Sequence, residues 1–92
     1  MKVRWATPAV NDLTCISDYI GKQGGNSAAR RIALTIFDRA NTLKQFPQRG
    51  RMGRIAGTRE LLIIGLPYLI VYRICKEVVE INRVLHGAQK WP

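Results

Sequence analysis

The C-terminal third of the chain determines which kind of sheet this protein can form. Three runs rich in β-branched and aromatic residues follow one another, at residues 59–64, 68–75 and 78–86. Gly65-Leu66-Pro67 separates the first two runs, and Lys76-Glu77 joins the last two. Because a two-residue connection joins antiparallel neighbours, these runs predict an antiparallel strand meander.

The first half of the chain changes from a strand period to a helix period. Residues 2–6 alternate polar and apolar side chains, which predicts a short strand, and Thr7-Pro8 is expected to cap and begin a helix. Apolar residues then recur at helical spacing as far as Gly24-Gly25. A second amphipathic helix is expected from a cap at Asn26-Ser27 to Pro47. The short link between the two predicts an antiparallel helical hairpin.

Length and element order bound the fold. The 92 residues, 47% of them hydrophobic, are enough for one compact domain spanning residues 1–92. The order β-α-α-β-β-β predicts an α+β fold, in which the helical hairpin packs on one face of a mostly antiparallel sheet. Residues 48–57 contain three Gly and three Arg without an apolar period, so we expect them to form a loop.

The tight turn at Lys76-Glu77 predicts a register for the last two strands. The expected cross-strand partners are Cys75 with Val78, Arg73 with Glu80, Val71 with Asn82, and Leu69 with Val84. The helices are expected to pack on the more apolar face, which holds Tyr68, Ile70, Tyr72, Ile74, Val79, Ile81, Arg83 and Leu85. The other face then carries Arg73, Glu80, Asn82 and His86, and we expect an ion pair between Arg73 and Glu80.

The chain is strongly basic. Fifteen Lys and Arg against six Asp and Glu give a formal net charge of +9, and ten of these cations are arginine. Such a surface favours nucleic acid, an acidic protein or anionic lipid as a partner, and arginine favours planar contacts to phosphate or carboxylate. Arg49, Arg51 and Arg54 either contact an anionic target or belong to a solvated loop.

His86 is the only histidine in the chain. Histidine is the residue type best suited to general acid–base catalysis near neutral pH, and Arg83 or Arg73 could bind a phosphate beside it. A histidine next to a phosphate-binding arginine would be suited to RNA cleavage. The alternative is that His86 closes a strand and has a structural role.

Other residue types point to no further chemistry. Cys15 and Cys75 are interpreted as reduced core residues, because two isolated cysteines form neither a disulfide framework nor a metal-ligand spacing. The chain has no glycine-rich phosphate loop and no Cys or His cluster, so no metal and no cofactor are expected. Tyr68 and Trp91 are expected to complete the core, with stacking on a nucleic-acid base as the alternative.

The sequence predicts a cytoplasmic protein. The longest apolar stretch, residues 61–72, is interrupted by Gly65 and Pro67 and is too short to span a bilayer. The first five residues contain no long apolar segment of the kind found in secretory signals.

Several short motifs stand in a characteristic order along nearly the whole chain. They are the opening strand followed by Ala6-Thr7-Pro8-Ala9-Val10-Asn11-Asp12-Leu13, then Ile16-Ser17-Asp18-Tyr19-Ile20, Phe46-Pro47 with its Gly/Arg loop, Thr58-Arg59-Glu60-Leu61, Tyr68 to Ile74, and Arg83-Val84-Leu85-His86. In order and spacing they resemble the RelE/ParE superfamily of toxins from bacterial type II toxin–antitoxin, or plasmid stabilisation, systems. The resemblance implies the same α+β fold.

The superfamily has two branches, and the motifs of this chain resemble one of them more than the other. RelE-like members are ribosome-dependent endoribonucleases that typically carry an arginine directly after the strand tyrosine, where it serves the scissile phosphate. Leu69 stands in that place here, and leucine cannot donate a hydrogen bond to phosphate. ParE-like members, which poison DNA gyrase, resemble this chain in Tyr72-Arg73 and in the final Arg83 to His86 strand.

Three hypotheses follow from the resemblance. The first is a ParE-like protein inhibitor of DNA gyrase without chemistry of its own, whose target contacts are Arg49, Arg51, Arg54, Arg59, Arg73 and Arg83. The second is a ribosome-dependent mRNA endoribonuclease that uses His86 with Arg83 or Arg73. The third is a basic interaction module or an inactive member of the superfamily.

The resemblance further implies a partner. Toxins of this superfamily bind a cognate acidic antitoxin, ParD-like or similar, whose segment lies across the helical hairpin in a hetero-oligomer. The residues expected to meet it are Leu13, Ile16, Ile20, Ile36 and Ala40. The net charge of +9 would steer such an acidic partner to the toxin.

Overall fold

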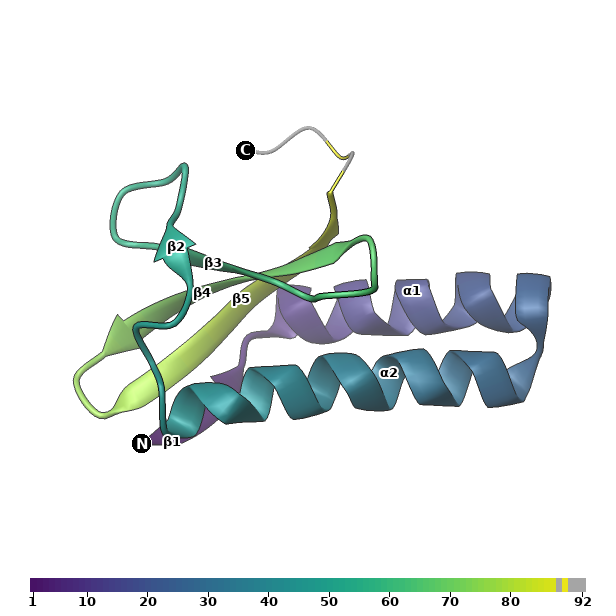
Figure 1. Ribbon diagram of the computed structural model, residues 1–92, viewed down its shortest axis with the longest axis horizontal. Coiled ribbons are helices and arrows are strands. Elements are labelled where there is room, and N and C mark those ends of the chain that lie inside the picture. The colour runs from purple at the N-terminus through teal and green to yellow at the C-terminus, as the bar shows by residue number, and fades with distance from the viewer. Residues whose placement is uncertain (88, 90–92) are drawn as a thin grey trace.

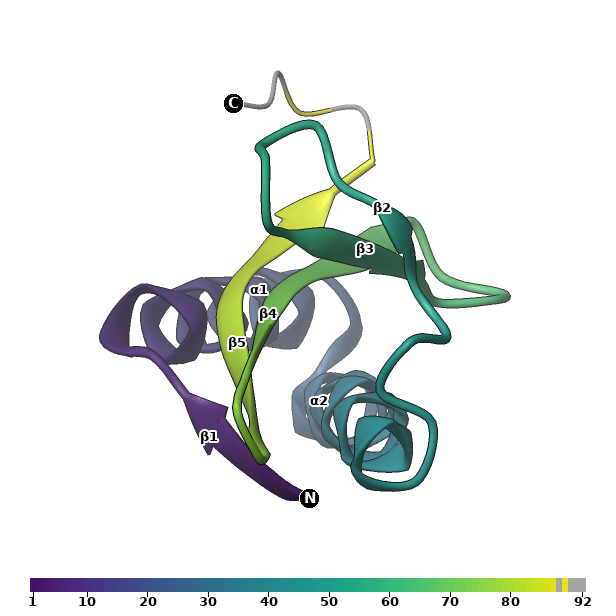
Figure 2. The ribbon, with the colours of Figure 1, turned by 90° about the vertical axis from the view of Figure 1, so that its left-hand side faces the viewer.

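The computed structural model describes residues 1–87 and 89, and it consists of a five-stranded sheet with a helical hairpin on one side (Figures 1 and 2). The elements in chain order are β1 (Lys2–Trp5), α1 (Thr7–Gly24), α2 (Asn26–Asn41), the 3-10 turn η1 (Thr42–Lys44), β2 (Arg51–Met52), β3 (Arg59–Leu62), β4 (Tyr68–Cys75) and β5 (Val78–His86). The predicted α+β fold is confirmed.

The sheet has the strand order β1-β5-β4-β3-β2, and it is mixed. The meander β2-β3-β4-β5 is antiparallel. Strand β1 pairs in parallel with β5, although both helices and the strands β2 to β4 lie between the two in sequence. The strand β2 was not predicted, because its two residues lie in the segment expected to be a loop. Arg51 and Met52 pair with Glu60 and Arg59 of β3, so the ladder of the neighbouring strand decides their conformation.

The starts of both helices differ from the predicted N-caps by one residue. Ala6, and not Thr7, precedes α1, and its carbonyl accepts hydrogen bonds from the N–H groups of Ala9 and Val10 at 3.0 and 3.1 Å. Gly25 alone links α1 to α2, with a φ of 89°, so the expected cap Asn26 is already helical. A left-handed φ costs glycine least, which is why one residue suffices to reverse the chain. The second helix ends at Asn41, before the predicted stop.

A bulge in β5 changes the predicted register. Cys75 pairs with Val78 and Arg73 with Glu80 as predicted, but a shift next to Val71 and Tyr72 leaves Asn82 without a partner in the ladder. Beyond it the predicted pairs are wrong, because Val71 lies opposite Arg83 and Leu69 opposite Leu85. An extra residue reverses the side-chain alternation that follows it. Val84 therefore packs toward the helices, and Arg83 and Leu85 do not.

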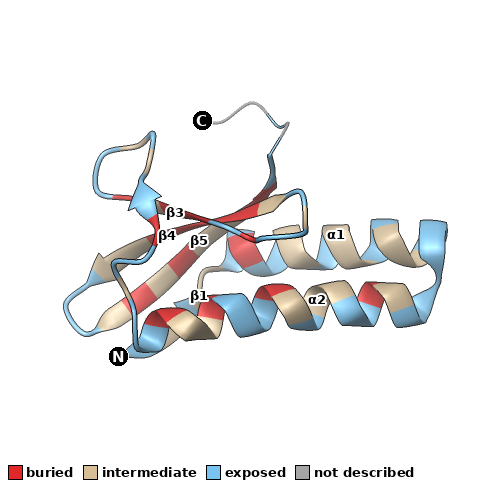
Figure 3. Ribbon diagram, in the orientation of Figure 1, coloured by how far each residue is buried: buried red, intermediate tan, exposed pale blue. Residues whose placement is uncertain are grey.

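The main core lies between the sheet and the helices, where buried residues of both layers meet (Figure 3). Its fully buried members include Ile36, Ala40, Ile70, Tyr72 and Ile81. A small second cluster of Leu69, Val71 and Leu85 is buried on the other side of the sheet. We call that other side, which carries Arg4, Arg51, Glu60, Arg73, Glu80 and Arg83 by strand register, the open face.

Three further predictions concern side chains of the expected core. Cys15 and Cys75 are free and exposed, so their assignment to the core is wrong. Cys15 lies on an outward side of α1, and Cys75 is the last residue of β4 before the turn. Tyr68 is half-buried against the main core as expected. Trp91 lies outside the described residues.

Candidate functional site

Strand register alone assembles two rows of charged side chains on the open face. One row runs across β1, β5 and β4 through Arg4, Glu80 and Arg73. The other runs across β5, β4, β3 and β2 through Arg83, Val71, Glu60 and Arg51. Because neighbouring strands are about 4.8 Å apart, each carboxylate lies within reach of a guanidinium in its own row.

In the first row, Glu80 is held by the neighbouring strand β1. The Arg4 guanidinium donates to a Glu80 carboxylate oxygen at 2.7 Å, and the Asn82 amide donates to the other oxygen at 2.9 Å. These two bonds, together with the charges of Arg4 and Arg73, hold the pKa of Glu80 below its usual range. The predicted ion pair between Arg73 and Glu80 is wrong: Arg73 lies opposite Glu80 as predicted, but the two carboxylate oxygens accept from Arg4 and Asn82 instead.

In the second row, Arg83 is bound to the first turns of α1. Its Nε and Nη2 atoms donate to the two carboxylate oxygens of Asp12 at 2.6 and 3.0 Å. The same carboxylate accepts the backbone N–H of Val84 at 2.9 Å, a group on the β5 edge beyond the end of β1. The bond to Asp12 raises the pKa of the Arg83 guanidinium above its usual value. Asp12 therefore closes the sheet edge and fixes Arg83 with the same side chain.

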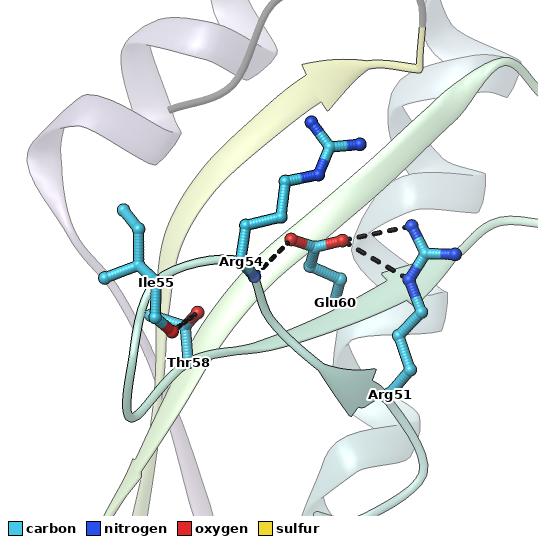
Figure 4. A network of polar contacts seen from close by, with 5 residues as sticks. All are labelled: Arg51, Arg54, Ile55, Thr58 and Glu60. Atoms are coloured by element: carbon cyan, nitrogen blue, oxygen red, sulfur yellow. Dashed lines mark hydrogen bonds and ion pairs between the residues drawn. The ribbon is translucent and has the colours of Figure 1, made fainter.

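A buried carboxylate organises the β2–β3 segment (Figure 4). Glu60 is 2% exposed, and the Arg51 guanidinium donates to its Oε1 from Nη2 at 3.0 Å and from Nε at 3.3 Å. The backbone N–H of Arg54 donates to Oε2 at 3.1 Å. Burial by itself would raise the pKa of Glu60, but the bonds from Arg54 and Arg51 outweigh it and lower the pKa. The segment expected to be a loop is thus fixed on the open face.

The preceding segment is fixed from the helix side of the sheet. The Tyr72 hydroxyl accepts the backbone N–H of Gly50 at 2.8 Å and donates to the Pro47 carbonyl at 2.7 Å. Arg59, the cross-strand neighbour of Tyr72, donates to the Gly50 carbonyl at 2.9 Å. A side chain at position 50 would meet the Tyr72 ring at 2.7 Å, so only glycine fits. The Arg59 guanidinium is therefore engaged in a hydrogen bond to the backbone of this protein.

The structure separates the predicted arginines into two groups. Arg51, Arg73 and Arg83 lie on the open face, and Arg54 joins them through its bond to Glu60. Arg49 is exposed in the segment between η1 and β2, where it donates to the Thr42 hydroxyl at 3.4 Å, and Arg59 points to the helix side. Sequence reasoning missed Arg4, although its alternation with Val3 and Trp5 already placed it opposite the apolar side chains.

His86 does not join the arginines of the open face. It pairs with Tyr68 across β4 and β5, and the two rings meet edge to face with centroids 5.7 Å apart. Tyr68 packs against the main core, so strand alternation places His86 on the helix side of the sheet. The expected grouping of His86 with Arg73 is wrong, because the bulge at Asn82 reverses the alternation between them.

Comparison with known proteins identifies the chain. A family model described as the ParE toxin of the type II toxin–antitoxin system parDE matches residues 3–91. The chain belongs to the ParE toxin family. It is therefore a type II toxin of the ParE/RelE superfamily, as the order of its motifs predicted, and such a toxin implies an antitoxin partner.

Relatives of this ParE-family chain support the assignment over its full length. It is 42% identical over 91 residues to "Putative toxin Y4kP" of Sinorhizobium fredii, covering 99% of this chain and 93% of the relative. It is 41% identical over 88 residues to "Toxin RelE2" of Caulobacter vibrioides, covering 96% and 97%. A solved chain from the chromosomal ParDE TA system of P. aeruginosa has the same fold, with a TM-score of 0.88 at 24% identity over 94% and 95% of the two chains.

On the ParE-family helical hairpin, the residues expected to meet an antitoxin differ in accessibility. Leu13, Ile16 and Ile20 are half-buried, whereas Ile36 and Ala40 are 0% exposed and hold α2 against the sheet. Large apolar side chains that do remain exposed on the helices are Val10, Tyr19, Leu34 and Phe37. The apolar period of the sequence did not distinguish these from core residues.

Two further observations are limited to the described part of this ParE-family chain. Within residues 1–87 and 89, no three His, Cys, Asp or Glu side chains come together as metal ligands would. No helix over the same residues is long and apolar enough to cross a membrane.

Proposed function

We propose that this ParE-family toxin inhibits DNA gyrase as a protein ligand, is neutralised by a cognate acidic antitoxin in a hetero-oligomer, and performs no chemistry itself. The observation that carries the proposal is the separation of His86 from the arginines of the open face. General acid–base catalysis of RNA cleavage needs a proton-transferring group within hydrogen-bond reach of the phosphate-binding groups. Here the sheet stands between them.

Leu69 supports the same proposal. It occupies the position after the strand tyrosine where RelE-like ribonucleases carry a phosphate-binding arginine, and it is 4% exposed in the open-face cluster. A buried leucine can neither donate a hydrogen bond nor balance developing charge. A toxin that acts only by binding its target needs neither a hydrogen-bond donor nor a charge-balancing group at position 69.

The second candidate function is a ribosome-dependent mRNA endoribonuclease. The name of the 41% identical relative, RelE2, favours it, and so do the guanidinium groups of Arg73 and Arg83 on one face. In that function the two arginines would bind the scissile phosphate, and His86 would have to act from the strand end. The place of His86 on the opposite face of the sheet from the arginines is the reason we place this function second.

The antitoxin is proposed to lie on the helical hairpin. Leu13, Ile16 and Ile20 keep part of their apolar surface accessible on α1, and an amphipathic partner helix could bury that surface. Ile36 and Ala40 would support the hairpin from beneath without touching the partner. The net charge of +9 favours an acidic partner by steering its approach.

Two assays on the purified chain test the proposal. We expect inhibition of plasmid supercoiling by gyrase, and intact message in a translation reaction analysed by primer extension. The His86→Ala variant should inhibit gyrase as the wild type does. Codon-positioned cleavage of ribosome-bound message that His86→Ala abolishes, together with normal supercoiling, would replace the gyrase proposal with the ribonuclease.

A further inference from the structure

Two ion pairs of the open face, Arg4–Glu80 and Arg51–Glu60, are oriented in the same way. The Arg4 side chain is 62% exposed and its partner Glu80 is 25% exposed. The Arg51 side chain is 54% exposed, and the side chain of its partner Glu60 is 1% exposed. In both pairs the carboxylate lies inward and the guanidinium outward, so solvent meets the cation.

This orientation fixes guanidinium groups for contact with an anion. A guanidinium has five N–H donors, and the bonds to carboxylate engage one donor of Arg4 and two donors of Arg51. A side chain already held by its partner loses less conformational freedom when it binds something else. Arg73, a half-buried residue, adds a guanidinium in the same row as Arg4, close to Gly57 of the β2–β3 segment.

We propose that the open face binds the sugar–phosphate backbone of duplex DNA, with Arg4, Arg51 and Arg73 as the phosphate contacts. The choice of DNA rests on the proposed function, because a toxin seated on gyrase lies beside the duplex that gyrase handles. Arginine forks match phosphate oxygens, and binding to the backbone requires no base-specific groups.

The position of these arginines favours phosphate over an acidic peptide. Extended peptides bind sheets at an edge, where free backbone groups are available, or bind grooves between elements. Arg73 lies on β4, in the middle of the sheet, and Arg4 and Arg51 stand on the strands at its two edges. The three arginines are thus distributed from one edge of the sheet to the other, which suits a broad partner with charges along two strands.

The test compares two double variants that remove the same charge from different faces. Arg4→Gln with Arg73→Gln alters the open face, and Arg30→Gln with Arg31→Gln alters exposed positions of α2. Binding of the full chain to a fluorescent DNA duplex of about two helical turns is measured by anisotropy at several salt concentrations. We expect the wild type to bind with a Kd of about 10⁻⁴ to 10⁻⁶ M near physiological salt.

The open-face variant should bind about tenfold more weakly than the wild type, because it loses two charge-assisted contacts. Its slope of log affinity against log salt should fall by about 1.8, since each lost phosphate contact removes about 0.9. The α2 variant should keep most of the affinity and slope. Arg4→Lys with Arg73→Lys should keep the slope and lose part of the affinity, because lysine keeps the charge without the fork. Thermal unfolding of each variant verifies that it is folded.

Three results would overturn the inference. The first is an equal loss in the α2 variant, which would mean that net charge alone binds DNA. The second is competition by polyglutamate as strong as that by DNA at equal charge concentration, which would indicate an acidic protein partner. The third is tighter binding to single-stranded or duplex RNA than to DNA, which would favour the ribosomal target.

Failure of the inference and failure of the proposed function give different results, because DNA binding is measured without gyrase. If the wild type inhibits supercoiling but the open-face variant binds DNA as tightly as the wild type, only the inference is contradicted. A wild-type chain that binds DNA through the open face but leaves supercoiling unchanged contradicts only the proposed function.

Discussion

Alternate residues of the same strands lie on opposite faces of the sheet, and the two faces differ in composition and role. On the helix side, Ile70, Tyr72 and Ile81 are fully buried and join the sheet to the helices. On the open face, the intervening residues form rows of guanidinium and carboxylate groups beside the small buried cluster of Leu69, Val71 and Leu85. The helix side thus supplies the stability that holds the charges of the open face in position.

The bulge at Asn82 decides which residues belong to each face. Without it, Arg83 and Leu85 would point toward the helices, and Val84 would point away from them. With it, Arg83 reaches Asp12 from the open face, and His86 lies on the helix side. One extra residue therefore separates the only histidine from the arginines, and the proposed binding function rests on that separation.

The largest expected effect comes from the helix side. Ile81→Ala removes a fully buried side chain from the main core and should lower the free energy of unfolding by about 2–5 kcal/mol. Small domains are stabilised by only about 5–15 kcal/mol in total. Urea denaturation followed by circular dichroism measures the change. An equally large loss in Arg73→Ala, on the open face of the neighbouring strand, would contradict the division of roles between the two faces.

A smaller effect, dependent on pH, is expected at the buried carboxylate of the open face. Glu60→Gln should cost about 1–3 kcal/mol at pH 7, because the charge that accepts from Arg51 and Arg54 is lost. The lowered pKa of Glu60 means that its stabilising contribution is present above the unfolded value of about 4.3 and is lost as pH falls below it.

The difference in stability between wild type and Glu60→Gln should therefore shrink between pH 6 and pH 3. Urea denaturation at a series of pH values measures it. Glu77→Gln, at the exposed turn between β4 and β5, is the matched control and should show a difference that stays small throughout. A difference for Glu60→Gln that grows toward acid pH would have the wrong sign for this network.

The link between the helix side of the sheet and residues 47–50, which precede β2, is expected to depend on the Tyr72 hydroxyl group. Tyr72→Phe leaves the buried N–H of Gly50 without its acceptor and should cost about 1–2 kcal/mol. Hydrogen exchange should also show faster exchange at Gly50. Tyr19→Phe, at a site 63% exposed on α1, should change stability by less than about 0.5 kcal/mol. Equal effects of the two substitutions would show that the hydroxyl does not hold the segment.

The smallest effect is expected at the end of β5. His86→Ala removes an exposed side chain whose contact with Tyr68 is edge to face, so stability should change by about 1 kcal/mol or less. Thermal denaturation checks this value. A loss as large as that of Ile81→Ala would show that the strand end has a structural importance beyond this contact.

Much of the fold could be predicted from local patterns. The helical hairpin, β4, β5 and the tight turn at Lys76-Glu77 follow from apolar period and turn residues, and each depends on neighbours close in sequence. The strand β2 could not be found in this way, because its two residues are ordered by pairing with β3 and by the bonds to Glu60. A strand of that length has no periodicity of its own.

The candidate site was predicted in its residue types but not in its contacts. Arg73 and Arg83 were expected on the basis of motif resemblance, and both lie on the open face. Their partners could not be read from the sequence, since Arg4 and Glu80 are 76 residues apart, and Asp12 and Arg83 are 71 apart. Pairs of such separation are set by strand order, which local period does not determine.

The sequence by itself determined the order of the two helices and the four longer strands, the apolar side of β4 and the excess of cations. It could do so because side-chain alternation and net charge are properties of the chain before it folds. The tertiary structure decided that β1 lies parallel beside β5, that a bulge lies at Asn82, and that His86 and the arginines occupy opposite faces. These features depend on pairings between distant strands, and hence on the free energy of the whole packed sheet.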